Sequence, residues 1–285
     1  MNNLRGVVEQ IRAKPASDGD GVKLLRVFGG QGPERFDPFL MLDEFGSQQA
    51  SDYIGGFPSH PHRGFQTVTY MLQGKMEHKD HMGNIGLIDG GDVQWMNAGS
   101  GVIHSEMPRQ TEGKMRGFQL WVNLPAEKKM APADYKEGKA QDIPVYQHPD
   151  YCIKAIAGSV ELEGEQLKGY FAIEDTDVLF LDIHLQPQAK LELPVPEAYH
   201  SLVYTYEGEV SLGAAEVQAQ SQTLSRFDGA GAVAIENTAQ EISRVLLLAG
   251  KPLKQPIVQY GPFVMNTVAE IEQAIADYQA GQLTA

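Results

Sequence analysis

Short apolar runs that alternate with polar residues recur along most of the chain, and turn residues separate them. Residues 65–72 read FQTVTYML, and residues 116–124 read RGFQLWVNL. Runs of this length, rich in β-branched and aromatic residues, are typical of strands with one buried face. Turn sequences that contain glycine lie at residues 18–21, 73–75, 82–84, 89–91 and 97–101. Many short strands at this spacing predict an all-β sandwich or barrel fold.

One segment departs from this pattern, because the tail of the chain has helical periodicity. Its apolar residues recur at intervals of three and four: Val268, Ile271, Ile275 and Tyr278. Thr267 and Glu270 have the spacing of a capping box at a helix start. Gly281 follows as a stop signal. We therefore expect a short C-terminal helix at about residues 267–280.

Two pairs of residues have the chemistry and the spacing of metal ligands. His60 is followed by His62, and His104 is followed by Glu106. In a strand, residues i and i+2 point to the same face, so each pair aims two ligand atoms at one point. If the strands close into a barrel, both pairs can face its interior. Three imidazoles and one carboxylate predict a site for one divalent transition metal, and the spacing alone admits Fe, Mn, Co, Ni, Cu or Zn.

The second half of the chain repeats the first weakly. Residues 199–210 read YHSLVYTYEGEV and resemble residues 65–76, which read FQTVTYMLQGKM. On that register, Pro194 and Pro196 replace the first ligand pair, and proline side chains cannot bind a metal. We expect the same architecture in both halves, with the metal site in the first half alone.

The chain is long enough for two domains. Its 285 residues can form two separate hydrophobic cores. The segment 125–145 is charged and contains three prolines, which is typical of a linker. We expect an N-terminal, metal-binding domain at residues 1–132 and a degenerate, metal-free domain at residues 133–285.

Charge and hydropathy argue against two classes of partner. The formal net charge is −14, and residues 155–249 contain 15 acidic and 4 basic residues. An acidic surface repels phosphate backbones, so we expect no direct binding to nucleic acid. No apolar run approaches the length of a membrane span, so we expect no membrane partner.

The N-terminal sequence and the cysteine content indicate the compartment. The single cysteine, Cys152, cannot form an intramolecular disulfide. Residues 1–21 lack the uninterrupted apolar core of a signal peptide. We therefore expect an intracellular protein, which is cytoplasmic or, in a eukaryote, also nuclear. We also expect it to be a monomer.

Three segments together resemble the pirin family, whose members have two cupin domains. They are HPHRGFQTVTYMLQGKMEH at residues 60–78, GDVQWMNAGSGVIHSEMP at residues 91–108 and GPFVMNT at residues 261–267. The resemblance implies two tandem cupin (jelly-roll) barrels, of which the N-terminal one binds iron and the C-terminal one has lost its ligands. It also implies that the iron ligands are His60, His62, His104 and Glu106.

The chain departs from the broader cupin pattern in two places. That pattern has a metal-binding Glu shortly after the second His, where this chain has Gln66 and Thr67. The Pro-x-Gly of the second cupin motif is replaced by Asn-Ala-Gly at residues 97–99. In this chain Glu106 would supply the carboxylate instead.

The resemblance also implies an activity. Several pirin-like proteins are flavonol dioxygenases, similar in chemistry to quercetin 2,3-dioxygenase, which open the flavonol C-ring with O2 and release carbon monoxide. We therefore expect an Fe(II)-dependent enzyme that takes a flavonol-like aromatic substrate and O2. Glu106 is the candidate catalytic base, which accepts the proton of the substrate 3-hydroxyl.

Other pirins are regulators that bind partner proteins, and this gives a hypothesis of a different class. The chain would then be a non-enzymatic, iron-dependent regulator that acts through a protein partner. Its support in this sequence is the acidic second half, which has no site of its own. A cupin isomerase, or a dioxygenase of another substrate, is the third hypothesis.

Two further histidines and several large apolar residues lie near the ligand pairs in sequence. His78 and His81, three residues apart, point to opposite faces of a strand. We expect His81 at the surface or in a turn, and we consider a supporting role beside the metal for His78. The large apolar residues could line a substrate pocket, although barrel core explains most of them: Phe65, Trp95, Met96, Phe118 and Trp121.

Overall fold

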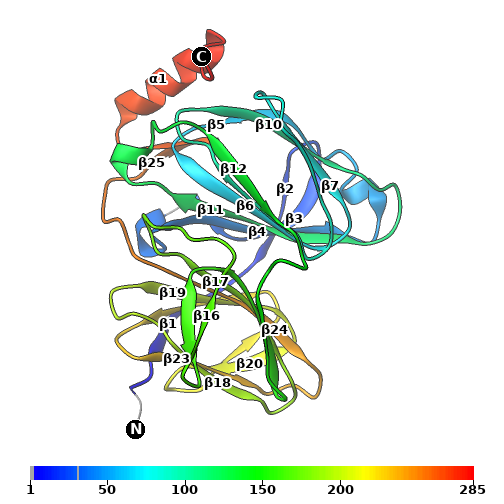
Figure 1. Cartoon of the computed structure of the whole chain (residues 1–285), viewed down its shortest axis with the longest axis vertical. Helices are drawn as coiled ribbons and strands as arrows, with labels where there is room; N and C mark the ends of the chain where they lie inside the picture. Colours follow the sequence, from blue (N-terminus) through cyan, green and yellow to red (C-terminus); the bar gives the residue numbers. More distant parts are fainter. Residues whose placement is uncertain (1–2, 31) are drawn as a thin grey trace. The chain divides into compact units, whose positions relative to one another are not determined.

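The computed structural model describes residues 3–30 and 32–285, and strands form nearly all of its regular structure (Figure 1). They build two barrels, each from a seven-stranded and a four-stranded sheet. The first-barrel unit comprises Lys14–Ala140 and Leu253–Ala285. The second-barrel unit comprises the described residues up to Ala13 together with Gln141–Pro252. The predicted all-β fold with two barrels is confirmed.

All strands of the two sheets of the first barrel come from the segment Lys14–Ala140. Its larger sheet has the order β12 (Asp134–Gly138), β9 (Val93–Asn97), β6 (Phe65–Gln73), β11 (Met115–Asn123), β4 (Phe39–Ser47), β3 (Val22–Gly29) and β2 (Lys14–Asp18). Its smaller sheet has the order β5 (Phe57–His62), β10 (Val102–Pro108), β7 (Met76–Asp80) and β8 (Ile85–Ile88). The remaining elements are η1 (Pro33–Arg35), η2 (Ala50–Asp52), η3 (Ala126–Lys128), the hairpin β25 (Val258–Tyr260) and β26 (Phe263–Met265), and α1 (Val268–Gln279).

Apolar side chains from both sheets pack together inside the first barrel. Leu24, Phe45 and Met71 come from the seven-stranded sheet, and Met76 and Ile88 come from the four-stranded sheet. All five are buried. Complete burial of one such side chain contributes about 1.5–3 kcal/mol, so this cluster holds the two sheets against each other.

The second barrel repeats this arrangement. Its larger sheet has the order β1 (Gly6–Arg12), β22 (Thr223–Asp228), β19 (His200–Glu207), β24 (Ser243–Gly250), β17 (Leu179–Leu185), β14 (Tyr151–Ala157) and β13 (Val145–Gln147). Its smaller sheet has the order β18 (Lys190–Pro194), β23 (Ala232–Asn237), β20 (Glu209–Leu212) and β21 (Val217–Gln220). A separate hairpin consists of β15 (Ser159–Leu162) and β16 (Glu165–Lys168).

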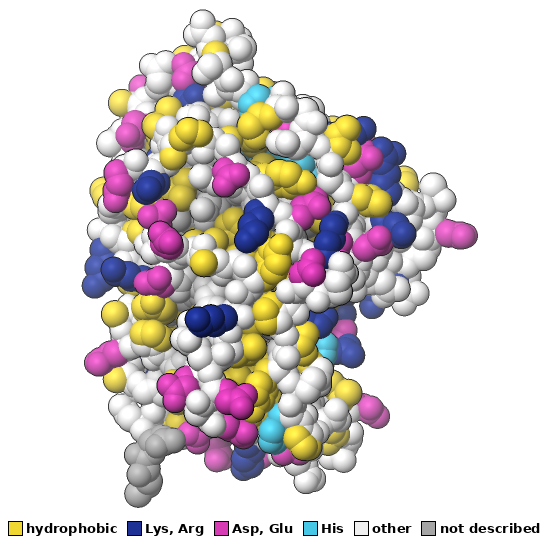
Figure 2. All heavy atoms as spheres, in the orientation of Figure 1, with side chains coloured by type: hydrophobic (Ala, Val, Ile, Leu, Met, Phe, Trp, Pro, Cys, Tyr) yellow, Lys and Arg dark blue, Asp and Glu magenta, His cyan; other side chains and the backbone are white. Residues whose placement is uncertain are grey.

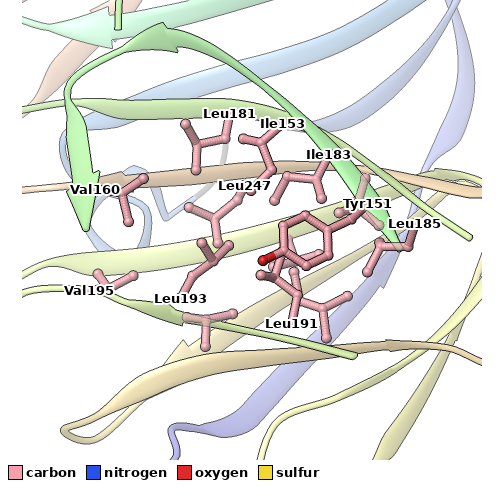
Figure 3. Close-up of a cluster of buried hydrophobic side chains, with 14 of the residues drawn as sticks. Tyr151, Ile153, Val160, Leu181, Ile183, Leu185, Leu191, Leu193, Val195 and Leu247 are labelled. Atoms are coloured by element: carbon pink, nitrogen blue, oxygen red, sulfur yellow. The ribbon is translucent and has the colours of Figure 1, made fainter. Parts of the chain in front are cut away.

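Aliphatic side chains fill the interior of the second barrel (Figure 3). Leu181 and Leu247 come from its larger sheet, and Leu191 and Leu193 come from its smaller sheet. Alternate residues along each strand point inward, which is the period of two that the sequence shows.

The hairpins that carry the internal sequence repeat are equivalent in the two barrels. β6 turns into β7 at Gly74, and β19 turns into β20 at Gly208. Both glycines have a positive φ, of 94° and 78°, which other residues rarely adopt. The two halves therefore share one architecture, as the repeat predicted.

The two units differ from the expected division at residues 132 and 133 in three places. β1 pairs with β22 and so belongs to the second barrel. β12, inside the expected linker 125–145, pairs with β9 of the first barrel. The tail from Leu253 onward belongs to the first-barrel unit. A strand bonds wherever a sheet edge offers partners for its backbone, and composition does not show which edge that is.

The tail of the chain is the predicted helix. α1 begins after Thr267, which forms the predicted capping box with Glu270. Arg63 ties this tail to the first barrel, because its Nη1 donates to Asp277 at 2.6 Å and its Nη2 donates to the carbonyl oxygen of Leu283 at 3.2 Å. The C-terminal residues therefore support the turn that follows β5.

The acidic surplus belongs to the second-barrel unit, which contains all of residues 155–249. Figure 2 shows acidic and basic side chains spread over the face that it draws. Within the part of the chain that the structure describes, no helix has both the length and the apolar character needed to cross a membrane.

Lys129 is a lysine buried in the first-barrel unit, with 1% of its surface exposed. Its Nζ donates to the carbonyl oxygens of Gly64 and Val264 at 2.7 and 3.0 Å, and to Oδ1 of Asn123 at 2.7 Å. It thereby joins the approach to β6, the end of β11 and the strand β26. Burial lowers the pKa of Lys129 to about 7.

We expect the free energy of unfolding of the wild type to rise, relative to that of Lys129→Met, as the pH increases from about 7 towards 10.5. In this range the unfolded chain still binds the lysine proton and the folded chain has released it, so a higher pH favours the folded state. The change is at most about 1.4 kcal/mol per pH unit. Denaturant unfolding of both proteins across this range measures it, and a difference that stays constant with pH would contradict the assignment.

Candidate metal centre

The register of β5 and β10 brings the two predicted ligand pairs together. His104 lies directly opposite His60, and Val102 lies opposite His62. The ring centroids are 4.7 Å apart for His60 and His62, 4.4 Å for His60 and His104, and 4.9 Å for His62 and His104. β5 is an edge strand of its sheet, which is where a proline such as Pro61 is tolerated.

His60 and His62 turn the same ring nitrogen to one point. Their Nε2 atoms are 3.0 Å apart. Nδ1 of His60 lies 2.8 Å from the carbonyl oxygen of Pro58, and because a carbonyl only accepts, this Nδ1 carries the proton and Nε2 keeps its lone pair. Two nitrogens bound at right angles to a divalent ion at about 2.1 Å lie about 3.0 Å apart. The spacing therefore fits two ligands of one ion.

The surroundings keep His62 and His104 in the neutral form that binds metals. Burial lowers the pKa of His62 well below its usual value, and the neighbouring His60 adds to the effect. Burial also lowers the pKa of His104 well below its usual value. Among the described residues, the buried Nε2 of His104 has no hydrogen-bond partner. An unpaired buried polar atom costs about 1–3 kcal/mol, so a nitrogen left in this state fits a ligand position.

Glu106 is buried and is held by a hydrogen bond at one oxygen. The register of β10 against β5 shifts between His104 and Glu106. Oγ1 of Thr69 lies 2.9 Å from Oε1 of Glu106 and 2.8 Å from Oε1 of Gln119. One hydroxyl has one proton, and the carboxylate is the stronger acceptor. The second contact is satisfied when the amide of Gln119 turns its NH2 end to Thr69.

The structure adds His78 to the cluster. It lies opposite Glu106 in the pair formed by β7 and β10, and it is buried. Its Nδ1 is 3.3 Å from Nδ1 of His104, so one of these nitrogens donates to the other. The ring of Tyr135 stacks on His78, with the centroids 5.5 Å apart and the planes at 6°. Burial lowers the pKa of His78, which favours the neutral ring.

Two overlapping sets of potential ligands meet at His104. One set is His60, His62 and His104, and the other is His78, His104 and Glu106; the ligand atoms of each set lie within 4.8 Å of one another. All four residues that the sequence predicted occur in these sets, which share His104, but Glu106 is not in the set that contains His60 and His62. A cluster of imidazoles and one carboxylate fits a divalent transition metal.

From the sequence we considered only a supporting role for His78, because no local sequence pattern places it beside Glu106. His78 meets Glu106 through the register of β7 and β10, and that register depends on the whole sheet. His81 lies in an exposed turn, as expected.

A cavity of about 590 Å³ lies against the cluster, and this size is typical of small-molecule sites. His60, His62 and Glu106 line it. Large apolar residues line it as well: Leu24, Met41, Phe45, Phe57 and Trp121. The cavity therefore presents the candidate ligands to an apolar or aromatic molecule.

Trp121 is the member of the sequence-derived aromatic and apolar set that lines this cavity. Its ring centroid lies 5.5 Å from that of His62 and 4.3 Å from that of Phe65. The other four residues are buried and belong to the barrel interior: Phe65, Trp95, Met96 and Phe118.

Within the described residues, the second-barrel unit has no corresponding group of ligands. Pro194 and Pro196, which the repeat aligns with the first histidine pair, are exposed. Leu191, Leu193 and Val195 point into the core instead. Apolar packing therefore occupies the interior of this barrel.

Comparison with known families agrees with this geometry. A family profile described as Pirin matches residues 21–122, and one described as Pirin C-terminal cupin domain matches residues 180–284. Together they cover more than half of the chain. The chain belongs to the pirin family. Both barrels of this pirin are therefore cupin domains, as the sequence implied.

Relatives of this pirin match nearly its whole length. A protein of Pseudomonas aeruginosa, provisionally named quercetin 2,3-dioxygenase, is 50% identical over 285 residues, which cover 99% of each chain. Human pirin is 39% identical over 283 residues, which cover 98% of this chain and 94% of the human one. The crystal structure of quercetin 2,3-dioxygenase from Acinetobacter baumannii matches with a TM-score of 0.89 at 35% identity and covers 99% of each chain.

We expect this pirin to bind one divalent metal ion per chain. The first barrel brings the predicted ligands together, and the second has prolines at the matching positions. Elemental analysis of metal-loaded protein measures the ratio, and His60→Ala and His104→Ala should each lose the ion. A second equivalent that both variants retain would show that the second barrel binds metal too.

His78→Phe should weaken metal binding by about 10-fold or more, because it removes the partner of His104 Nδ1 while an aromatic ring still stacks on Tyr135. Competition with a chelator of known affinity measures the change. His81→Phe is the matched control and should bind metal as the wild type does. Wild-type affinity in His78→Phe would refute the orienting role, and complete loss of metal would make His78 a ligand itself.

Proposed function

We propose that this pirin is a metal-dependent flavonol dioxygenase of the quercetin 2,3-dioxygenase type, which opens the flavonol C-ring with O2 and releases carbon monoxide. The main support for the proposal is the position of His60 and His62. Their Nε2 atoms lie 3.0 Å apart, and both residues line a cavity of about 590 Å³. The names of the Pseudomonas and Acinetobacter relatives support this choice of reaction.

Fe(II) is the metal that we assign to the site, on the basis of the family and of the donor set. His60, His62, His104 and Glu106 would hold it, and a set of imidazoles and one carboxylate with open positions suits this ion. When bound, the ion lowers the pKa of a hydroxyl that coordinates to it and supplies the redox chemistry towards O2. Mn, Co, Ni, Cu and Zn would fit the same donors.

Glu106 is the residue that we assign as the catalytic base for the 3-hydroxyl of the substrate. Its carboxylate lines the cavity beside the two histidines. Thr69 donates to Oε1 and so fixes the orientation of the group. A lone pair that neither Thr69 nor the metal uses would remain for a proton from the substrate, and a general base typically contributes about 10²–10⁴-fold to the rate.

The apolar wall of the cavity gives the substrate its position. Phe57 and Trp121 present aromatic surface on the same cavity as the candidate ligands. A planar aromatic substrate packs on such surfaces and gains from the area that it buries. These residues would hold the ring system so that its 3-hydroxyl meets Glu106.

We expect Glu106→Gln to retain much of the metal and to lose most of its flavonol turnover, by about 10²–10⁴-fold. Three imidazoles remain as ligands, whereas the carboxylate that accepts the proton is gone. Carbon monoxide release from quercetin in air, divided by measured metal content, gives the rate. His104→Ala is the control, because removal of a ligand should reduce metal and activity together.

Two outcomes would count against this function. If metal-loaded Glu106→Gln converts quercetin at the wild-type rate, Glu106 is not the base. If the iron-loaded wild type releases no carbon monoxide at all, the flavonol reaction is wrong. The iron-dependent regulator that acts through a protein partner then becomes the better hypothesis.

A further inference from the structure

A row of polar side chains crosses the seven-stranded sheet of the first barrel. Arg26 on β3 lies opposite Asp43 on β4, and Asp43 lies opposite Gln119 on β11. Gln119 lies opposite Thr69 on β6, whose hydroxyl donates to Glu106. This polar row (Arg26, Asp43, Gln119 and Thr69) leads from the candidate base across four neighbouring strands, and its first three members line the cavity.

Apolar residues flank the polar row on both sides. Two residues away along the strands, Leu24 lies opposite Phe45 on one side, and Met41 lies opposite Trp121 on the other. All four line the cavity. The cavity wall is thus a line of hydrogen-bonding groups between two apolar strips, which matches a planar aromatic molecule with oxygen substituents.

Arg26 occupies the end of the row farthest from Glu106, and not all of its N–H groups are used in hydrogen bonds within the described residues. Its Nε and Nη2 donate to the two oxygens of Asp43 at 3.0 and 2.7 Å, and Nη2 also reaches Asp18 at 3.3 Å. None of the residues that the structure describes accepts a hydrogen bond from Nη1. The side chain is 37% exposed and lines the cavity, and we take Nη1 to be the donor that a molecule in the cavity reaches.

The charges around Arg26 determine which kind of oxygen it can bind. One guanidinium faces two carboxylates, those of Asp43 and Asp18, so the group carries a net charge of −1. A ligand carboxylate or phosphate would meet this surplus negative charge. A neutral phenolic hydroxyl needs only a donor for its oxygen, and Nη1 supplies one.

We propose that the polar row recognises a phenolic hydroxyl of the substrate and that Arg26 sets this specificity. The proposal rests on the proposed function, because it places the substrate oxygens that bind the metal at the Glu106 end of the row. It narrows the substrate class to planar aromatic compounds with a neutral hydroxyl on the ring remote from those oxygens. Compounds with a carboxylate at that position are excluded by the surplus negative charge.

Anaerobic binding to the full-length, metal-loaded protein tests the proposal without turnover. The probes are quercetin, which has hydroxyls on its outer rings, and 3-hydroxyflavone, which has none there. The wild type should bind quercetin more tightly. In the double variant Arg26→Met, Asp43→Asn, this preference should fall about tenfold, the effect of one hydrogen bond from a charged donor. Replacing both residues avoids a buried, unpaired Asp43.

Two further variants separate recognition from general damage to the cavity. Met41→Leu alters an apolar strip and should change the affinities for both probes by the same factor. Arg26→Lys keeps the charge but loses the forked donors, so its preference for quercetin should lie between those of the wild type and the double variant. Circular dichroism and metal content show that each variant is folded and loaded.

The outcomes distinguish this proposal from the proposed function. If the folded, metal-loaded double variant keeps the full preference for quercetin, the proposal is overturned, whether or not carbon monoxide is formed. If the preference is lost and the wild type releases no carbon monoxide in air, the recognition site stands and the flavonol reaction is overturned. If the wild type binds neither probe, the phenolic specificity is wrong.

Discussion

The register between β5 and β10 is the constraint on which the candidate metal centre depends. It sets His104 opposite His60, and the same face of β5 then carries His62. A slip of one residue would turn an entire ligand pair to the other face of the sheet. Phe57, on β5, packs against the core cluster of the first barrel, and this contact opposes such a slip. The geometry of the site therefore depends on core packing as well as on the candidate ligands.

The interiors of the two barrels differ in polarity. The second barrel keeps the two-sheet architecture with a mainly aliphatic interior. The first barrel instead buries His62, His104 and Glu106, whose removal from water is unfavourable unless partners replace the solvent. Thr69 is one such partner, and a metal ion would be another. The same fold thus holds the candidate metal centre in one half and a packed apolar interior in the other.

Local sequence patterns predicted much of this structure, and long-range pairing explains what they missed. Alternation along 65–72 and 116–124 predicted strands, the capping box of Thr267 predicted the helix, and i, i+2 spacing identified the candidate ligand pairs, because each signal lies within a few residues. His78 and the polar row were not predicted in their positions, since both arise from the register of strands distant in sequence. The placement of β1 and β12 was missed for the same reason.

The two units alternate along the chain, because each consists of two segments separated by a segment of the other. Gly6 pairs with Asp228, so β1 joins a sheet whose other strands all follow the first-barrel segment in the sequence. Arg63, next to His62, donates to the carbonyl oxygen of Leu283, which follows the second-barrel segment. No single cut of the backbone therefore separates the two units. A fragment that stops before Leu253 would keep the strands of both barrels but lose the contact of the tail with the turn beside His62.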